Sequence, residues 1–107
     1  MTLNSTHWQD QIDVLLTDES GTVLEALGDG GGELVRALPS SDDPSYPYLR
    51  FIDWLDTTTF TARQMRGVVP ELRRLAREHP SAPLERVLEM AERCERTTHS
   101  RLVFDGV

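Results

Sequence analysis

The chain of 107 residues contains no lysine, and all 11 of its basic residues are arginines. A Walker A loop needs a lysine to reach the phosphates, so this class of nucleotide site is excluded. The single cysteine, Cys94, has no partner for an internal disulfide, which fits a reducing compartment. The longest apolar runs, such as residues 14–16, are far too short to cross a bilayer.

Length and composition predict one domain over residues 1–107, with residues 1–10 flexible. At 38% hydrophobic and 27% charged residues, the chain is typical of globular proteins rather than disordered ones. Residues 1–11 contain no basic side chain, so no secretory signal is expected there. We therefore expect a cytoplasmic protein.

Charge is distributed unevenly along the sequence. Residues 1–58 hold 11 carboxylates and two arginines, whereas residues 59–107 hold seven carboxylates and nine arginines, and the net charge is −7. This asymmetry predicts an acidic surface built by the first half of the chain. Such a surface would repel nucleic acid and anionic membranes and would attract a basic partner.

The first part of the chain is predicted to form a hairpin and a short helix. Residues 12–17 and 22–27 are β-type runs, and Asp18-Glu19-Ser20-Gly21 between them suits a type I turn. After the glycine-rich residues 28–32, residues 33–38 can form a helix that Pro39 ends. One face of the hairpin is expected to be shared by Ile12, Val14, Leu16, Val23 and Leu27.

A proline-rich loop over residues 39–47 is predicted to lead into a strand over residues 48–54. Residues 59–60 are expected to pair briefly with a neighbouring strand. Thr61 and Gln64 have the spacing of a capping box. Because Gly67 and Pro70 interrupt the apolar stripe that follows, a firm helix is expected only over residues 69–78.

A second helix is predicted after residue 80. Ser81 is suited to cap it, Pro83 to stand in its first turn, and Glu89 is spaced to pair with Arg93. Residues 101–105 then form a closing strand. Together these elements predict an α+β fold, a small and mostly antiparallel sheet of three to five strands with a two-helix hairpin packed on one face.

No cofactor and no metal site is predicted. The glycine tract ends in Glu33, where a dinucleotide-binding loop needs a glycine. The loop that starts at Asp18 has Val23 where a calcium loop needs glycine, and the histidines are widely spaced. Cys94 lies on the apolar stripe of the second helix, which is typical of a buried, unreactive thiol.

Aromatic and acidic residues alternate between residues 42 and 56. Tyrosine and tryptophan among carboxylates are typical of a surface that binds a basic protein, with an affinity that falls as salt is added. No catalytic residue is predicted. The predicted partner-binding residues are Asp42, Asp43, Tyr46, Asp53, Trp54 and Asp56.

The segments YPYLRFIDWLDTTTFTARQM, ELRRL and HSRLVFDG lie within residues 46–75 and 99–106. In these segments the chain resembles small, uncharacterised bacterial proteins of the candidate immunity-protein type, which are antidotes of contact-dependent toxins. The resemblance covers about a third of the chain and carries no functional residue. It implies a compact acidic protein that neutralises a basic toxin.

Three functions stay open on the sequence. The leading one is a non-enzymatic module that binds a basic protein. The second is a small enzyme or ligand sensor that uses Asp53, Asp56 and His99 in a cleft between residues 48–54 and the helices. The third is an accessory protein that forms a homodimer through an exposed sheet edge.

Overall fold

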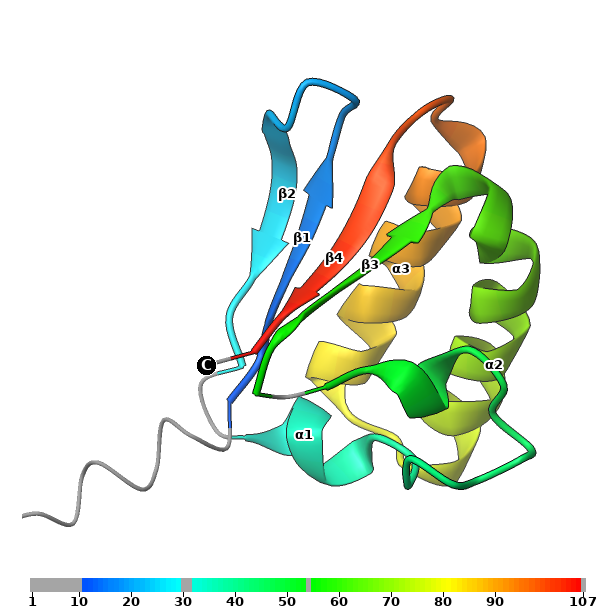
Figure 1. Cartoon of the computed structure of the whole chain (residues 1–107). Helices are drawn as coiled ribbons and strands as arrows, with labels where there is room; N and C mark the ends of the chain where they lie inside the picture. Colours follow the sequence, from blue (N-terminus) through cyan, green and yellow to red (C-terminus); the bar gives the residue numbers. More distant parts are fainter. Residues whose placement is uncertain (1–10, 30–31, 54, 107) are drawn as a thin grey trace, which may run out of the picture.

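The computed structural model describes residues 11–29, 32–53 and 55–106, and two helices cover one face of its four-stranded sheet (Figure 1). The expected flexibility of residues 1–10 falls outside these residues. The strands follow the order β2-β1-β4-β3, and all neighbours are antiparallel. The predicted α+β class is confirmed. The strands are β1 (Asp13–Thr17), β2 (Val23–Leu27), β3 (Thr57–Thr61) and β4 (Arg101–Asp105).

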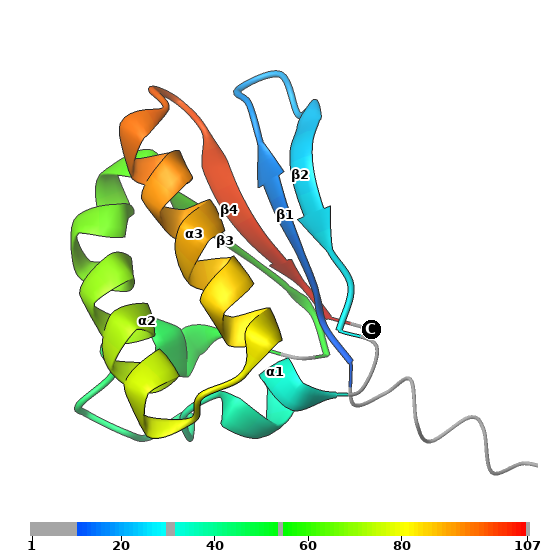
Figure 2. The ribbon, with the colours of Figure 1, turned by 180° about the vertical axis from the view of Figure 1, so that it is seen from behind.

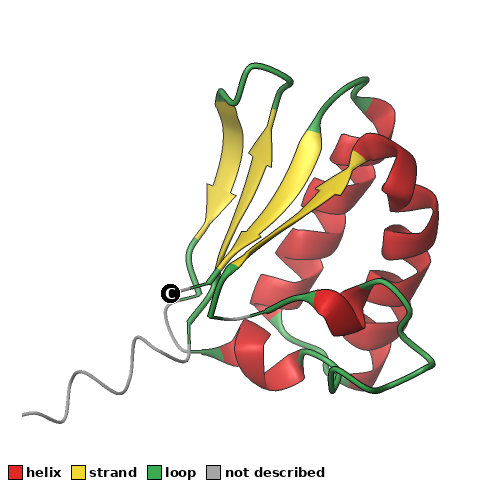
Figure 3. Ribbon diagram, viewed as in Figure 1, coloured by secondary structure: helices red, strands yellow, loops and turns green. Residues whose placement is uncertain are grey.

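Three α-helices accompany the sheet. The long helices α2 (Met65–Glu78) and α3 (Ala82–Arg96) form the hairpin on one face, and the short α1 (Glu33–Ala37) lies near one end of the sheet (Figures 2 and 3). Two 3₁₀ turns, η3 (Leu49–Phe51) and η4 (Ala62–Gln64), complete the described chain. The helix pair on a single face agrees with the prediction.

The core lies between the sheet and the helix pair. Strand residues alternate across a sheet, and the set that faces the helices is apolar and buried. The ring of Phe60 on β3 packs edge-to-face with that of Phe104 on β4, with centroids 5.9 Å apart. The buried apolar residues of the strands are Val14, Leu16, Phe60, Leu102 and Phe104, and they meet Met65, Val68, Leu72, Val87, Met90 and Cys94 among others.

The predicted hairpin is confirmed, with one irregularity. Asp18 and Gly21 close the turn through a bond from the Gly21 amide to the Asp18 carbonyl. The register then shifts between Leu16 and Thr17, so that Val23 stands opposite Thr17. Because this bulge changes the face of the strand, Val23 is exposed and does not share the buried face of Val14 and Leu16 as predicted.

The first long helix begins earlier than the sequence predicts. The predicted capping box of Thr61 and Gln64 is present and starts η4, and α2 continues from Met65 through Pro70. Proline removes only the amide that would bond the carbonyl of Arg66, and both residues lie on the exposed face of the helix. Water can therefore satisfy that carbonyl, so the helix can begin at Met65 rather than at residue 69.

The predicted strand over residues 48–54 is wrong. Leu49–Phe51 form a 3₁₀ turn, and the third strand in sequence is Thr57–Thr61, where only a brief pairing of residues 59–60 was expected. Leu49 and Ile52 are buried while Phe51 is exposed, a spacing of three rather than two. A buried carboxylate described below binds the backbone amides that a strand would have paired.

Gly67 makes room for Tyr48. A Cβ atom added at Gly67 would lie 2.1 Å from Cε2 of Tyr48, whose ring also packs against Phe60. We expect Gly67→Ala to destabilise the protein by about 1–3 kcal/mol through this overlap, although alanine normally favours a helix by about 1 kcal/mol over glycine. Urea unfolding measures the change.

A Tyr48→Ala background supplies the control for that variant. With the ring removed, Gly67→Ala is expected to stabilise the protein by about 1 kcal/mol. If the sign is the same in both backgrounds, steric overlap with Tyr48 is not the cause.

Candidate functional site

A buried carboxylate on α2 fixes the loop that carries the predicted contact residues. Glu71 is 6% exposed, and its carboxylate accepts hydrogen bonds from the amides of Tyr48, at 3.1 Å, and Leu49, at 2.9 Å. These bonds take the place of a strand ladder and start η3. The loop is thereby held against α2.

Tyr46, a predicted contact residue, is an anchor in the core. Its ring is 4% exposed, its hydroxyl donates to Glu78 Oε1 at 2.7 Å, and the Arg74 guanidinium stacks 4.2 Å from the ring centroid. Arg74 also donates to the Ser45 carbonyl. Burial, reinforced by the bond to Glu78, raises the pKa of the Tyr46 hydroxyl. Tyr46 therefore offers almost no surface to a partner.

Asp42 and Asp43 lie at the surface, and their carboxylates accept hydrogen bonds from within their own loop. Asp42 Oδ1 accepts from the Ser40 hydroxyl at 2.6 Å. Asp43 Oδ1 accepts from the hydroxyl of Ser45 at 2.6 Å and from its amide at 3.0 Å. The hydroxyl and amide of Ser45 lower the pKa of Asp43, so its charge persists in mildly acidic solution.

The end of η3 and the residues that follow it expose two large apolar side chains. Phe51 is 61% exposed and Leu55 is 58% exposed. Phe51 borders a groove of about 550 Å³ whose other apolar walls are Val35, Leu38, Pro39 and Ile52. Trp54, the remaining predicted aromatic contact, lies outside the described residues.

Four aspartates meet at the end of the sheet where β1 and β3 begin, the lower end in Figure 1. Asp13 is the direct cross-strand partner of Asp105, and the amide of Gly106 donates to the carbonyl of Asp56 at 2.8 Å. The amide of Asp56 donates to the carbonyl of Asp53. We call Asp13, Asp53, Asp56 and Asp105 the acidic end. None of the four forms an ion pair with another described residue.

Two other carboxylates of the first half, Glu25 and Asp29, have partners elsewhere in the fold. Glu25 is neutralised by Arg86, at 3.1 Å, and by Arg93, at 2.5 Å, so Arg93 does not form the pair with Glu89 that the spacing predicted. Asp29 is buried and accepts from the amides of the first turn of α1. The expected single acidic surface is therefore replaced by a smaller one, and part of it, Asp105, comes from the second half.

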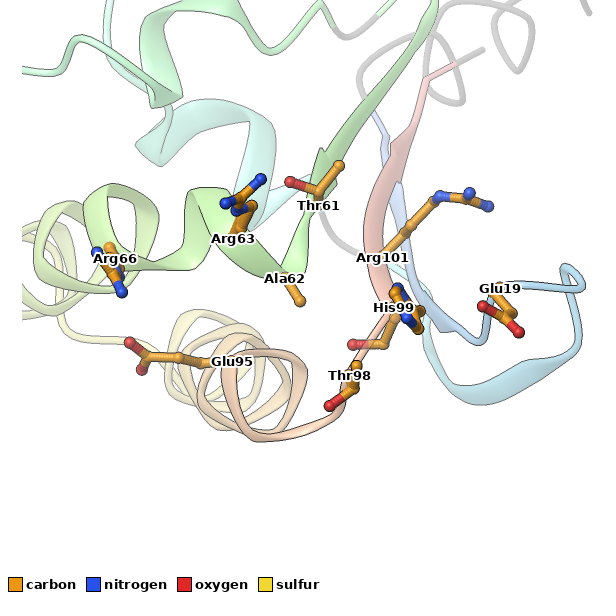
Figure 4. Close-up of a pocket in the computed structure, with 10 residues that line it drawn as sticks. Glu19, Thr61, Ala62, Arg63, Arg66, Glu95, Thr98, His99 and Arg101 are labelled. Atoms are coloured by element: carbon orange, nitrogen blue, oxygen red, sulfur yellow. The ribbon is translucent and has the colours of Figure 1, made fainter.

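A second candidate site lies at the opposite end of the sheet. A cleft of about 780 Å³ opens between the start of α2, the end of α3 and the start of β4. Figure 4 shows Arg63 and Arg66 on one side, His99 and Arg101 on the other, and Ala62 between them. We call this the basic cleft. Its other lining residues are Glu19, Thr61, Glu95, Thr98 and Ser100.

The structure does not bring Asp53 and Asp56 together with His99. The two aspartates precede β3, next to Asp105, whereas His99 precedes β4, next to the pair of Thr61 and Arg101. A strand of five residues spans about 13 Å, so the two groups lie at opposite ends of the sheet. His99 lines the basic cleft and Asp53 lines the groove beside Phe51.

Cys94 is buried, as predicted from its place on α3. Burial raises the pKa of its thiol, and the Ser100 hydroxyl lies 3.3 Å from the sulfur. The thiolate needed for nucleophilic chemistry is therefore disfavoured.

Sequence reasoning missed the basic cleft. Arg63 and Arg101 are distant in the chain and line the same cleft only because β3 and β4 pair, and no spacing rule connects them. No three histidine, cysteine or acidic side chains among the described residues are placed to hold a metal ion. No helix formed by the described residues is long and apolar enough to cross a membrane.

Comparisons with protein families, curated proteins and solved structures found no match to this chain.

The anchoring role of Glu71 is testable. Glu71→Ala leaves two buried amides without an acceptor, and we expect a loss of about 2–4 kcal/mol of unfolding free energy. Hydrogen exchange of the Tyr48 and Leu49 amides should accelerate more than that of the sheet amides.

Two variants serve as controls for Glu71. Glu71→Gln keeps one acceptor oxygen and should lose less stability than the alanine variant. Glu85→Ala, on the exposed face of α3, should change stability by no more than about 0.5 kcal/mol. Equal losses for Glu71→Ala and Glu85→Ala would contradict the anchoring role.

Proposed function

We propose that this protein is a non-enzymatic binding module that holds a basic protein against Phe51, Leu55 and the acidic end. The observation that carries the proposal is the exposure of two large apolar side chains beside carboxylates that have no ion pair. Exposed apolar groups of this size, rimmed by charge, are typical of binding surfaces.

Apolar contact would supply most of the affinity. Phe51 and Leu55 are two of the three large hydrophobic residues that the described chain exposes, and they are four positions apart. The Arg50 guanidinium lies 4.8 Å from the Phe51 ring centroid, which limits the positions that the ring can adopt. An aromatic ring whose conformations are already restricted loses less conformational entropy on binding than an unrestricted ring.

The aspartates of the acidic end would orient the basic partner and increase its rate of association. Asp13 and Asp105 are directly opposite each other on neighbouring strands, and like charges in that arrangement are unfavourable. Arginine or lysine from a partner would relieve this repulsion. Electrostatic attraction of this kind raises association rates and weakens with salt.

The immunity-protein interpretation is the most specific form of this proposal. It rests on the resemblance of residues 46–75 and 99–106 and on the net charge of −7, which suits a basic toxin. In this interpretation the partner is a toxin that loses activity when the surface around Phe51 covers it. A homodimer is the second candidate, because β2 and β3 are the outer strands of the sheet.

The test changes charge while keeping local hydrogen bonding. Asp53 and Asp56 accept backbone amides through their side chains, and asparagine retains an acceptor oxygen. The partner is captured from the host lysate on the immobilised protein, identified, purified and titrated. We expect the double variant Asp53→Asn/Asp56→Asn to bind it about tenfold more weakly at low salt, and Phe51→Ser to bind more weakly at all salt concentrations.

A matched control carries the same change in net charge elsewhere. Glu85→Gln/Glu89→Gln alters two exposed carboxylates of α3 and should leave affinity unchanged. Equal weakening by both double variants would show that only net charge matters and would contradict the proposed surface. Light scattering on the unmodified protein tests the homodimer: a stable dimer that Phe51→Ser leaves intact would support pairing through β2 or β3, and one that Phe51→Ser abolishes would assign this surface to self-association.

A further inference from the structure

We propose that the basic cleft binds a small molecule that carries a phosphate group. Three arginines and a histidine line this cleft in a protein whose net charge is −7. Arginine is the side chain best suited to phosphate, because its planar fork donates two parallel hydrogen bonds. The proposal concerns a site separate from the protein-binding surface and does not depend on it.

The arginines of the cleft are not neutralised by a carboxylate, unlike several arginines elsewhere in the described chain. Arg73, Arg86 and Arg93 form ion pairs with carboxylates. Arg50 and Arg74 stack on aromatic rings. Arg63, Arg66 and Arg101 form no ion pair with any described residue, although Glu19 and Glu95 line the same cleft.

Backbone hydrogen bonds fix the positions of the residues that carry these arginine side chains. Thr61 and Arg101 are direct cross-strand partners, and the Ala62 amide donates to the Ser100 carbonyl at 3.1 Å. Arg63 and Arg66 follow on the exposed side of η4 and α2, three residues apart, where like charges repel each other. An anion between Arg63 and Arg101 would relieve the positive charge on both sides of the cleft.

His99 is held in an unfavourable backbone conformation at the edge of this cleft. Its φ is +64°, in the left-handed region that few residues other than glycine adopt. The buried Ser100 enforces this turn, because its amide and hydroxyl both donate to the Thr97 carbonyl and its hydroxyl also lies 3.0 Å from the Cys94 carbonyl. Strain of this kind, maintained by the surroundings, is frequent at ligand sites.

Size and charge favour a small ligand over a polymer. A cleft of about 780 Å³ falls in the range of small-molecule sites. A nucleic acid would have to continue from the cleft over a molecule of net charge −7, and that continuation is repulsive. A ligand with one phosphate avoids this repulsion, and the exposed Thr98 hydroxyl is available to a sugar or alcohol part of it.

Calorimetric titration of the full chain tests the site. The probes are inorganic phosphate, glycerol 3-phosphate and pyrophosphate, each at low salt. We expect saturable binding with one site per chain, weakened roughly tenfold by Arg63→Gln and roughly tenfold by Arg101→Gln, since each removes a charge-assisted hydrogen bond. Tighter binding of glycerol 3-phosphate than of phosphate would identify a phosphate ester as the natural ligand, and the reverse order would identify the free ion.

Two further variants separate the site from general charge and from folding. Arg77→Gln removes an exposed arginine at the other end of α2 and should leave binding unchanged. His99→Gly removes the strained side chain, so it should raise the urea midpoint while weakening glycerol 3-phosphate binding. A folding defect would lower both the urea midpoint and the affinity for glycerol 3-phosphate.

Three results would overturn the proposal. One is the absence of saturable binding for all three probes. Another is equal weakening by Arg77→Gln and Arg101→Gln, which would show nonspecific attraction. The third is tighter binding of a single-stranded oligonucleotide than of the small probes through Arg63 and Arg101, which would assign the cleft to a polymer.

Discussion

The pairing of β4 with both β1 and β3 is the constraint on which the rest of this structure depends. β4 lies between β1 and β3, so β3 cannot join the sheet without residues 101–105. That register places Asp13 beside Asp105 at one end and Thr17 and Thr61 beside Arg101 at the other. Both candidate sites are consequences of this single set of partners, since neither one is contained in a continuous segment.

Local sequence signals predicted the elements whose hydrogen bonds are local. The hairpin turn at Asp18, the capping box at Thr61 and the Ser81 cap of α3 each involve residues a few positions apart, and each is present. The strand expected over residues 48–54 failed because Glu71, more than 20 residues away, binds the amides of Tyr48 and Leu49. A tertiary contact of this kind leaves no trace in the local pattern of apolar residues.

The difference between local and tertiary contacts also explains why the observed acidic surface is smaller than the predicted one. Counting carboxylates predicted an acidic first half, which the sequence does contain, but counting could not show where each charge is neutralised. Arg86 and Arg93 reach Glu25 because α3 packs against the hairpin, and Asp29 is buried as a cap for α1. Of the predicted contact residues, Asp53 and Asp56 join the acidic end, Asp42 and Asp43 hold their own loop, and Tyr46 is part of the core.

The acidic end and the basic cleft lie at opposite ends of the strands. Unpaired aspartates lie at one end of the sheet and unpaired arginines at the other, about 13 Å apart along the strands. This separation exceeds the screening length of about 8 Å at physiological salt, so a ligand at one end changes the potential at the other only weakly. The two ends are also joined by a sheet whose one face is covered by the buried apolar core, and close-packed cores do not deform gradually. Occupancy of one site is therefore expected to leave the affinity of the other nearly unchanged, because coupling would need a second arrangement of the sheet that this packing does not offer.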